Sequence, residues 1–167
     1  MLRGRAWIFG DDISTDHIAP GRLFHLRTNL PELAKHVMED ADPEFAQKLS
    51  PGDFIVAGRN FGLGSSREHA PRIIKLAGVG AVLAQSFARI FFRNAINVGL
   101  PVLQCDTSGV GLGDELEVDL TAGEVRDLTK GTVVAFVPLP AVMVTILGDG
   151  GLVEHFKKHG GFALPEG

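Results

Sequence analysis

The sequence predicts an α/β fold: a mixed sheet with a parallel core, antiparallel C-terminal strands and flanking helices. Short apolar runs bounded by glycine or proline, at 54–57, 81–84 and 100–103, are typical of buried parallel strands. Apolar residues at helical spacing separate these runs, as in strand–helix–strand units. After Gly113 the pattern changes, because residues 115–120 alternate between acidic and apolar side chains. That alternation favours half-exposed antiparallel strands.

The elements of the first half follow from local signals. An apolar run within 5–10 predicts the first strand. A helix is expected from Pro31, with Thr28 or Asn29 placed to cap it, since proline is tolerated in a first turn. Residues 51–53 form a turn before the next strand.

The second half adds three further signals. A glycine-rich loop at 58–66 leads into a helix, and Pro71 within that helix predicts a kink or a late start. Ser86 is placed to cap the next helix. Two short helical patterns, separated by a glycine-rich break, are expected within 140–159.

Composition limits the classes of protein that remain. With 167 residues, we expect one domain over 1–167. A net charge of -4 without a basic stripe argues against a nucleic-acid partner. One cysteine, Cys105, excludes a disulfide framework and cannot alone hold zinc or an iron–sulfur cluster, so we expect no metal on this chain. The apolar stretch at 6–9 is too short for a signal peptide, and no run suggests a membrane partner. We therefore expect a cytoplasmic protein.

The segment 62–68 carries the strongest chemical signal. Its glycines let the backbone turn sharply and approach a ligand closely, and a helix start supplies free N–H groups. Ser65, Ser66 and Arg67 add donors suited to a carboxylate or a phosphate. The same residues also fit a capping box between Ser65 and Glu68. Both interpretations can hold together, because one serine remains free while the other caps.

Several known motifs fail on spacing at this segment. A P-loop needs lysine followed by Ser or Thr after its second glycine, and a dinucleotide fingerprint needs glycine at the position of Arg67. A hydrolase nucleophile elbow needs glycine two residues before and after its serine, which neither Ser65 nor Ser66 has. We interpret His69 as a solvated helix residue rather than a catalytic one.

Two other polar features have ordinary explanations. Three carboxylates and an imidazole lie within 11–17, but their spacing matches no calcium loop and favours turn and capping chemistry over a metal site. Arg27 follows Leu23 and Phe24, and a lone arginine of this kind is most often a solvated surface group.

Three segments together resemble the aconitase superfamily. They are STDHI at 14–18, GRNFGLGSSREH at 58–69 and SFARI at 86–90, in the order in which the superfamily has them. The resemblance covers nearly the whole chain and is closest to the free-standing small subunits of the isopropylmalate dehydratases and homoaconitases. It implies a swivelling β/β/α domain that docks, as one half of a heterodimer, on a large subunit holding a four-iron four-sulfur cluster. Such a partner explains the single cysteine; self-association of the chain alone stays open.

The resemblance also implies roles for individual residues. Ser65 matches the catalytic base that removes the proton next to a carboxylate. Ser66 and Arg67, with Gly64 in the same loop, match the substrate-binding residues. Asp16 matches a catalytic aspartate that pairs with a histidine of the large subunit.

The substrate is expected to be a small di- or tricarboxylate. Isopropylmalate, isomerised by dehydration and rehydration in leucine biosynthesis, is the first expectation. Arg27 resembles the homoaconitase version of a pocket-lining segment, so homocitrate of lysine biosynthesis is the alternative substrate. A non-catalytic anion-binding module and a purely structural subunit are rival interpretations from other classes.

Overall fold

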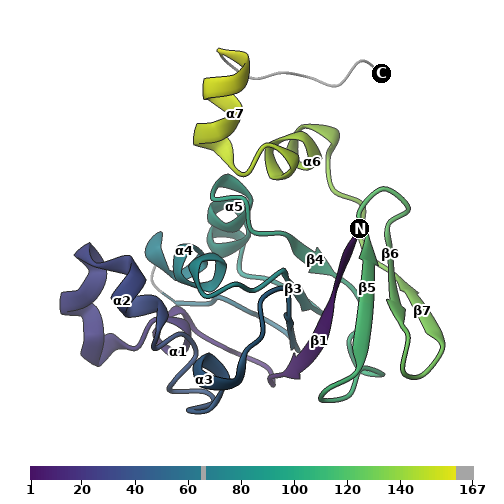
Figure 1. Ribbon diagram of the computed structural model, residues 1–167, viewed down its shortest axis with the longest axis horizontal. Helices are drawn as coiled ribbons and strands as arrows, with labels where there is room; N and C mark the ends of the chain where they lie inside the picture. The colour runs from purple at the N-terminus through teal and green to yellow at the C-terminus, as the bar shows by residue number, and fades with distance from the viewer. Residues whose placement is uncertain (65–66, 161–167) are drawn as a thin grey trace.

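The computed structural model describes residues 1–64 and 67–160. Its strands form one seven-stranded sheet in the order β4-β3-β2-β1-β5-β6-β7 (Figure 1). The strands are β1 (Leu2–Ile8), β2 (Phe54–Ala57), β3 (Ala81–Ala84), β4 (Val102–Gln104), β5 (Glu115–Asp119), β6 (Glu124–Asp127) and β7 (Thr132–Ala135).

Strand β1 joins a parallel half of the sheet to an antiparallel half. Its C-terminal part pairs with β2 in parallel, with Ala6 opposite Phe54. Its N-terminal part pairs with β5 in the antiparallel direction, with Leu2 opposite Val118. The parallel core and the antiparallel C-terminal strands are therefore confirmed. The strand begins earlier than expected because its antiparallel partner pairs with residues 2–5, and these residues, two arginines, a leucine and a glycine, give a weak strand signal.

The sheet has a core on each face, which explains the continuous apolar runs of its parallel strands. Along β2, Phe54 and Val56 point into one cluster, whereas Ile55 and Ala57 point into the other. The chain after β7 returns to β4, where the Val137 N–H donates to the Gln104 carbonyl at 2.8 Å. This contact curls the sheet around the first of these clusters.

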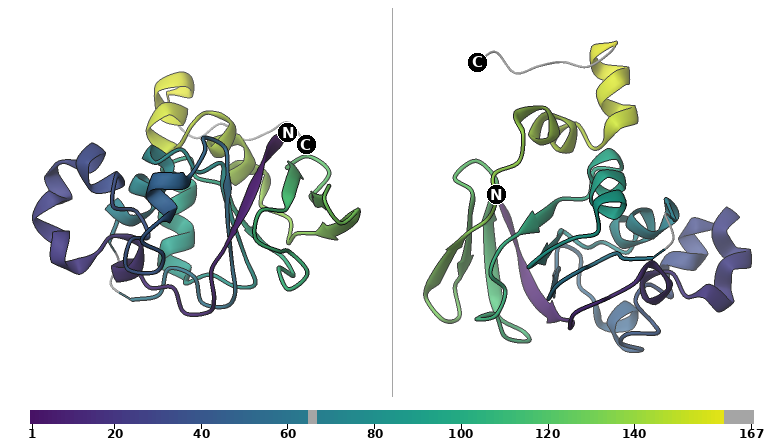
Figure 2. Two further views of the ribbon diagram at one scale, coloured as in Figure 1. Left: turned by 60° about the horizontal axis from the view of Figure 1, so that its bottom comes forward. Right: turned by 180° about the vertical axis from the view of Figure 1, so that it is seen from behind.

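The helices pack against the second cluster. They are α1 (Thr15–Ile18), the 3₁₀ helix η1 (Gly21–Thr28), α2 (Leu30–Ala34), α3 (Phe45–Lys48), α4 (His69–Leu76), α5 (Arg89–Asn97), α6 (Ala141–Gly148) and α7 (Leu152–His159). In Figure 1, α1 and α2 lie at the left, α6 and α7 lie at the top, and β7 is at the far right, while Figure 2 gives two further views. Helices α6 and α7 confirm the two helical patterns expected in the tail. No helix in the described part of the chain is long and apolar enough to cross a membrane.

The starts of α2 and α4 agree with the sequence predictions, and the start of α5 differs from them. Asn29 caps α2, its Oδ1 accepting from the Glu32 N–H at 3.4 Å. Helix α4 begins late, so Pro71 lies in its first turn, where it removes no intrahelical bond. Ser86 is not the cap of α5, and this prediction was wrong. Its hydroxyl instead accepts from the Asn60 N–H at 2.8 Å, in a loop distant in sequence.

Candidate functional site

Three loops meet where the parallel strands β1, β2 and β3 end. The Gly62 N–H donates to the Ile13 carbonyl at 2.7 Å, and the Thr15 N–H donates to the Leu63 carbonyl at 2.9 Å. The Ala88 N–H donates to the Phe61 carbonyl at 2.9 Å. These bonds bring the three family-like segments of the sequence together at one edge of the sheet. In open α/β sheets, ligands bind at this edge.

The first two loops are tied by aspartate side chains. An Asp11 Oδ1 atom accepts from the Arg59 N–H at 2.7 Å, and Asp12 Oδ1 accepts from Asn60 Nδ2 at 3.1 Å. Gly58 leaves room for this contact, because a Cβ at its position would overlap the Asp11 carboxylate where it now lies. The prediction of turn chemistry for this segment is confirmed.

Helix α1 begins with a capping box. Ser14 Oγ accepts from the His17 N–H at 3.2 Å, and the Ser14 N–H donates to His17 Nδ1 at 2.9 Å. The imidazole of His17 is thus engaged in capping, as the sequence indicated.

A cavity of about 220 Å³ lies at the meeting point of the loops. Of the predicted site residues that the structure describes, Gly64 and Arg67 line it, whereas Arg27 and Asp16 do not. The remaining lining residues come from α1, the second loop and α5: Thr15, Gly62, Ala88, Arg89, Ile90, Phe91 and Asn94. Ser65 and Ser66 lie outside the described residues, so their predicted capping and chemical roles stay predictions.

Arg67 is held in place by an ion pair with Asp16. The distance from Arg67 Nη1 to Asp16 Oδ1 is 2.7 Å, and the same nitrogen donates to the Ala19 carbonyl at 3.4 Å. The Arg67 side chain is 22% exposed and that of Asp16 is 63% exposed. The guanidinium is therefore fixed at the cavity, while its carboxylate partner remains open to solvent.

Phe24 of η1 brings the predicted arginines toward one another. The guanidinium carbon of Arg27 lies 4.3 Å from the centre of the Phe24 ring, and that of Arg67 lies 5.5 Å from it. Arg27 Nη1 also donates to the Phe24 carbonyl at 3.2 Å. Both cations thus lie within reach of a cation–π interaction with one exposed ring. The only sequence signal was an aromatic residue three positions before a candidate arginine.

His69 is half-buried rather than solvated. Its ring lies 6.4 Å from that of Phe24. Burial, followed by the charges of Arg67 and Arg27, holds the pKa of His69 below its ordinary value, so the imidazole is neutral at pH 7. The expectation of full solvation was wrong because η1 covers this face of α4.

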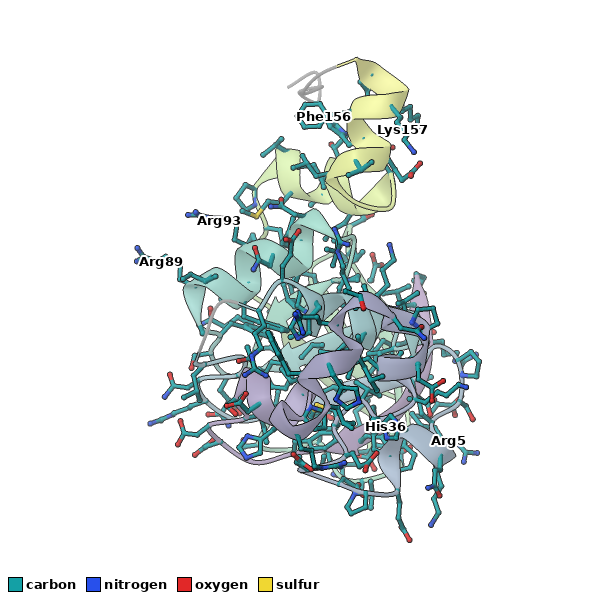
Figure 3. The ribbon with its side chains drawn as sticks, turned by 90° about the vertical axis from the view of Figure 1, so that its left-hand side faces the viewer. Arg5, His36, Arg89, Arg93, Phe156 and Lys157 are labelled. Atoms are coloured by element: carbon teal, nitrogen blue, oxygen red, sulfur yellow. The ribbon has the colours of Figure 1, made fainter. Side chains whose placement is uncertain are left out.

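The N-terminus of α5 also faces the cavity, which sequence reasoning missed. Its N-cap is Ala88, which makes no side-chain capping bond, and the next three residues line the cavity. The positive end of the helix dipole therefore adds to the charge of Arg67. Arg89 and Arg93 project outward from the same helix (Figure 3). Arg67 and the N-terminus of α5 together make the cavity suited to an anion.

Cys105 lies away from this site. It is half-buried and lines a separate cavity of about 30 Å³ with Leu83 and Asp127. Burial, followed by the charge of Asp106, raises the pKa of its thiol to about 11. The thiol is therefore protonated at neutral pH, and this single residue is a poor metal ligand.

The fold and the site define a mixed α/β domain with a cavity suited to an anion where its parallel strands end, the kind of domain found in the aconitase superfamily. The chain belongs to the aconitase C-terminal domain family, whose model matches residues 19–107.

Full-length relatives refine this assignment. The chain is 69% identical over 157 residues to 3-isopropylmalate dehydratase small subunit 2 of Archaeoglobus fulgidus, covering 94% of this chain and 95% of that protein. It is 55% identical over 159 residues to the methanogen homoaconitase small subunit of Methanothermobacter thermautotrophicus, covering 95% and 92%. The crystal structure of 3-isopropylmalate dehydratase from Methanocaldococcus jannaschii superposes with a TM-score of 0.91 at 45% identity, covering 95% of each chain. The predicted family and fold class are confirmed.

Proposed function

We propose that this chain is the small subunit of a 3-isopropylmalate dehydratase, a hydro-lyase that interconverts 2- and 3-isopropylmalate in leucine biosynthesis. A single domain over 1–167 and a cytoplasmic location belong to the same proposal. The observation that carries it is the convergence of the three family-like loops on a cavity that Gly64 and Arg67 line. Nearly full-length identity to dehydratase small subunits supports the choice of reaction.

Arg67 and the N-terminus of α5 are proposed to bind a carboxylate of the substrate. A guanidinium can bind a carboxylate through two parallel hydrogen bonds, which fixes its orientation as well as its charge. Gly64 has a φ of 106° and no side chain, so it leaves the backbone open to the ligand. Ser66, next to Arg67 in the chain, is proposed to add a hydroxyl donor.

Ser65 is proposed to be the base. A serine hydroxyl is a poor base unless its anion is stabilised, so it needs a positive electric field. The Arg67 guanidinium and the uncapped N-terminus of α5 supply such a field at the cavity. The proton to be removed lies next to the carboxylate that the same groups bind.

Asp16 is proposed to contribute through the assembled enzyme. In this chain its exposed carboxylate pairs with Arg67. The family resemblance assigns it a histidine of the large subunit as a partner. Such a pairing draws carboxylate charge away from Arg67, which makes the guanidinium more available to substrate.

A four-iron four-sulfur cluster is proposed to reside on the large subunit. This chain does not fit it, because its single thiol is protonated, half-buried and directed to another cavity. When bound on the partner, an iron of such a cluster supplies Lewis-acid chemistry for the hydroxyl group of the substrate. The residues of this chain bind the carboxylate and hold the proton.

Reconstitution tests the proposal. The chain is combined anaerobically with the large subunit, and steady-state rates are measured with isopropylmalate. Replacing Ser65 by Ala should lower kcat by about 10²- to 10⁴-fold, whereas Ser50→Ala, at an exposed serine remote from the cavity, should not change it. Equal rates for wild type and Ser65→Ala would favour a purely structural subunit. Inactivity of the wild-type complex on both isopropylmalate and homocitrate would favour an anion-binding module.

Homocitrate is the second candidate substrate, because Arg27 lies beside Phe24 with its side chain exposed. A third carboxylate reaching Arg27 would gain a charged hydrogen bond, worth about 1.5–3 kcal/mol. Replacing Arg27 by Val should then lower kcat/KM for homocitrate by about tenfold or more and leave isopropylmalate nearly unchanged. Equal effects on the two substrates would remove Arg27 from the specificity of the enzyme.

A further inference from the structure

A carboxylate and two imidazoles meet where α6 ends, on helices that do not line the cavity described above. Asp149, the C-cap of α6, places its Oδ2 atom 2.8 Å from His155 Nδ1 and 3.0 Å from His159 Nε2. The His155 side chain is fully buried, and that of Asp149 is only 7% exposed. Figure 1 shows α7 stacked against α6 at the end of the molecule.

The arrangement has the features of a metal site. His155 and His159 are four residues apart on one helix, so both imidazoles lie on the same face. The three facing donor atoms lie within 4.8 Å of one another. Zinc binds imidazole nitrogen and carboxylate oxygen at about 2.0–2.2 Å in a tetrahedral arrangement. Small side-chain rotations bring the three atoms to those distances.

The surroundings fit a coordinated carboxylate. Lys158 Nζ donates to Asp149 Oδ1 at 3.1 Å, which orients the carboxylate and leaves Oδ2 directed at the histidines. His159 is 31% exposed, which leaves a route for an ion and a position for water as a fourth ligand.

We propose that a divalent ion of the zinc class binds Asp149 Oδ2, His155 Nδ1 and His159 Nε2 and fixes α7 against α6. Two imidazoles and one carboxylate suit zinc better than calcium or magnesium, which prefer all-oxygen sites. The site is independent of the dehydratase reaction, because none of its residues lines the cavity between the three loops. The alternative is a purely structural cluster, in which the same hydrogen bonds hold α7 without an ion.

Calorimetry with zinc chloride tests the proposal on the full chain after treatment with a chelator. One ion per chain is expected, and His159→Ala should weaken binding by about tenfold or more. His25→Ala removes an exposed histidine of η1 and is the matched control, with unchanged binding. Absence of binding by the wild-type chain, or equal affinity of wild type and His159→Ala, would establish the structural cluster instead.

Two further measurements keep the test independent of folding. Far-UV circular dichroism establishes that His159→Ala is folded, and Asp149→Asn provides a second ligand variant that retains most of the side chain. Cobalt(II) should give the strong visible absorption of a four-coordinate site in wild type, and this absorption should be lost in both variants. An unchanged cobalt spectrum in both variants would place the ion elsewhere and overturn the proposal.

Discussion

Phe24 contacts both arginines that the family resemblance assigns to substrate binding. Its hydrocarbon ring has no group that can take part in the reaction. Its ring is exposed at the surface and lies under Arg27 and Arg67. We interpret it as a positioning residue that restricts the two guanidiniums to orientations suited to a carboxylate.

Replacing Phe24 by Ala should therefore raise KM more than it lowers kcat. A cation–π contact is worth about 0.5–2 kcal/mol, which corresponds to a rise in KM of roughly 2- to 30-fold. Phe24→Trp should restore most of the affinity, because it retains an aromatic face. Steady-state kinetics of the reconstituted enzyme check the result, and a fall in kcat alone would contradict the positioning role.

The stability of the antiparallel half of the sheet is expected to depend on pH through Asp127. Burial, followed by the neighbouring Asp114, raises its pKa, whereas hydrogen bonds from the Gly111 N–H and from Asp127 lower the pKa of Asp114 to about 2. The buried Oδ2 of Asp127 has no hydrogen-bond partner among the described residues unless it carries a proton. A proton on Asp127, donated to the Asp114 carboxylate, explains both shifts.

The sign of the effect follows from the raised pKa. Protonated Asp127 stabilises the fold, and this contribution is fully present at pH values below the pKa that the group has in the unfolded chain. The contribution is lost as the pH rises through the higher pKa that the group has in the folded protein. Asp127→Asn, which imitates the protonated form, should raise Tm by a few degrees at about pH 8 and change it little at about pH 4. Thermal unfolding followed by circular dichroism measures this.

Asp119, at the opposite end of the same hairpin, is the matched comparison. Hydrogen bonds from the Ala122 and Thr121 N–H groups lower its pKa, so its contribution is present above the unfolded pKa. Asp119→Asn should lower Tm at about pH 8. Equal responses of the two variants would contradict this assignment.

At the scale of elements, the site depends on how closely the second loop approaches α5. Gly62 has a φ of 85°, and a Cβ at this position would overlap the ring of Phe91 in the first turn of α5. Helix α5 can present its N-terminus to the cavity only because the loop lacks a side chain at this point.

Gly62→Ala should displace that helix start and impair both stability and activity. Strain and overpacking each cost about 1–3 kcal/mol, which predicts a fall in Tm of several degrees. Gly109→Ala is the control, because a Cβ there meets no atom within 4 Å. Unchanged Tm and kcat for Gly62→Ala would show that the close approach is not needed.

At the scale of the whole molecule, the proposed reaction is divided between two chains. In the proposal, this chain supplies the base and the carboxylate site, and the cluster lies on the large subunit. The purified chain alone should therefore show no dehydratase activity, as measured by formation of the unsaturated intermediate from isopropylmalate. Turnover by a preparation free of the large subunit would contradict the division.

The parallel strands, the antiparallel strands and the cap at Asn29 were predictable because each depends on neighbours in sequence. A continuous apolar run indicates a strand that is buried on both faces, and an alternation of apolar and polar residues indicates a strand with one exposed face. The family resemblance was equally accessible, because it lies in three short segments of fixed order. The single cysteine indicated that this chain cannot hold a cluster by itself, and the large subunit followed only from the family resemblance.

Contacts between distant segments decided the rest. Ser86 resembles a cap in sequence, but its hydroxyl is taken by Asn60, 26 residues away. Asp16 and Arg67 form an ion pair beside the cavity. Phe24 lies beneath the guanidinium of Arg67, which follows it by 43 residues in the chain. Local sequence determines which elements form and what chemistry they carry. Which of those groups face one another is decided by the packing of helices on the sheet, since a hydrogen bond or an ion pair depends on distance in space rather than along the chain.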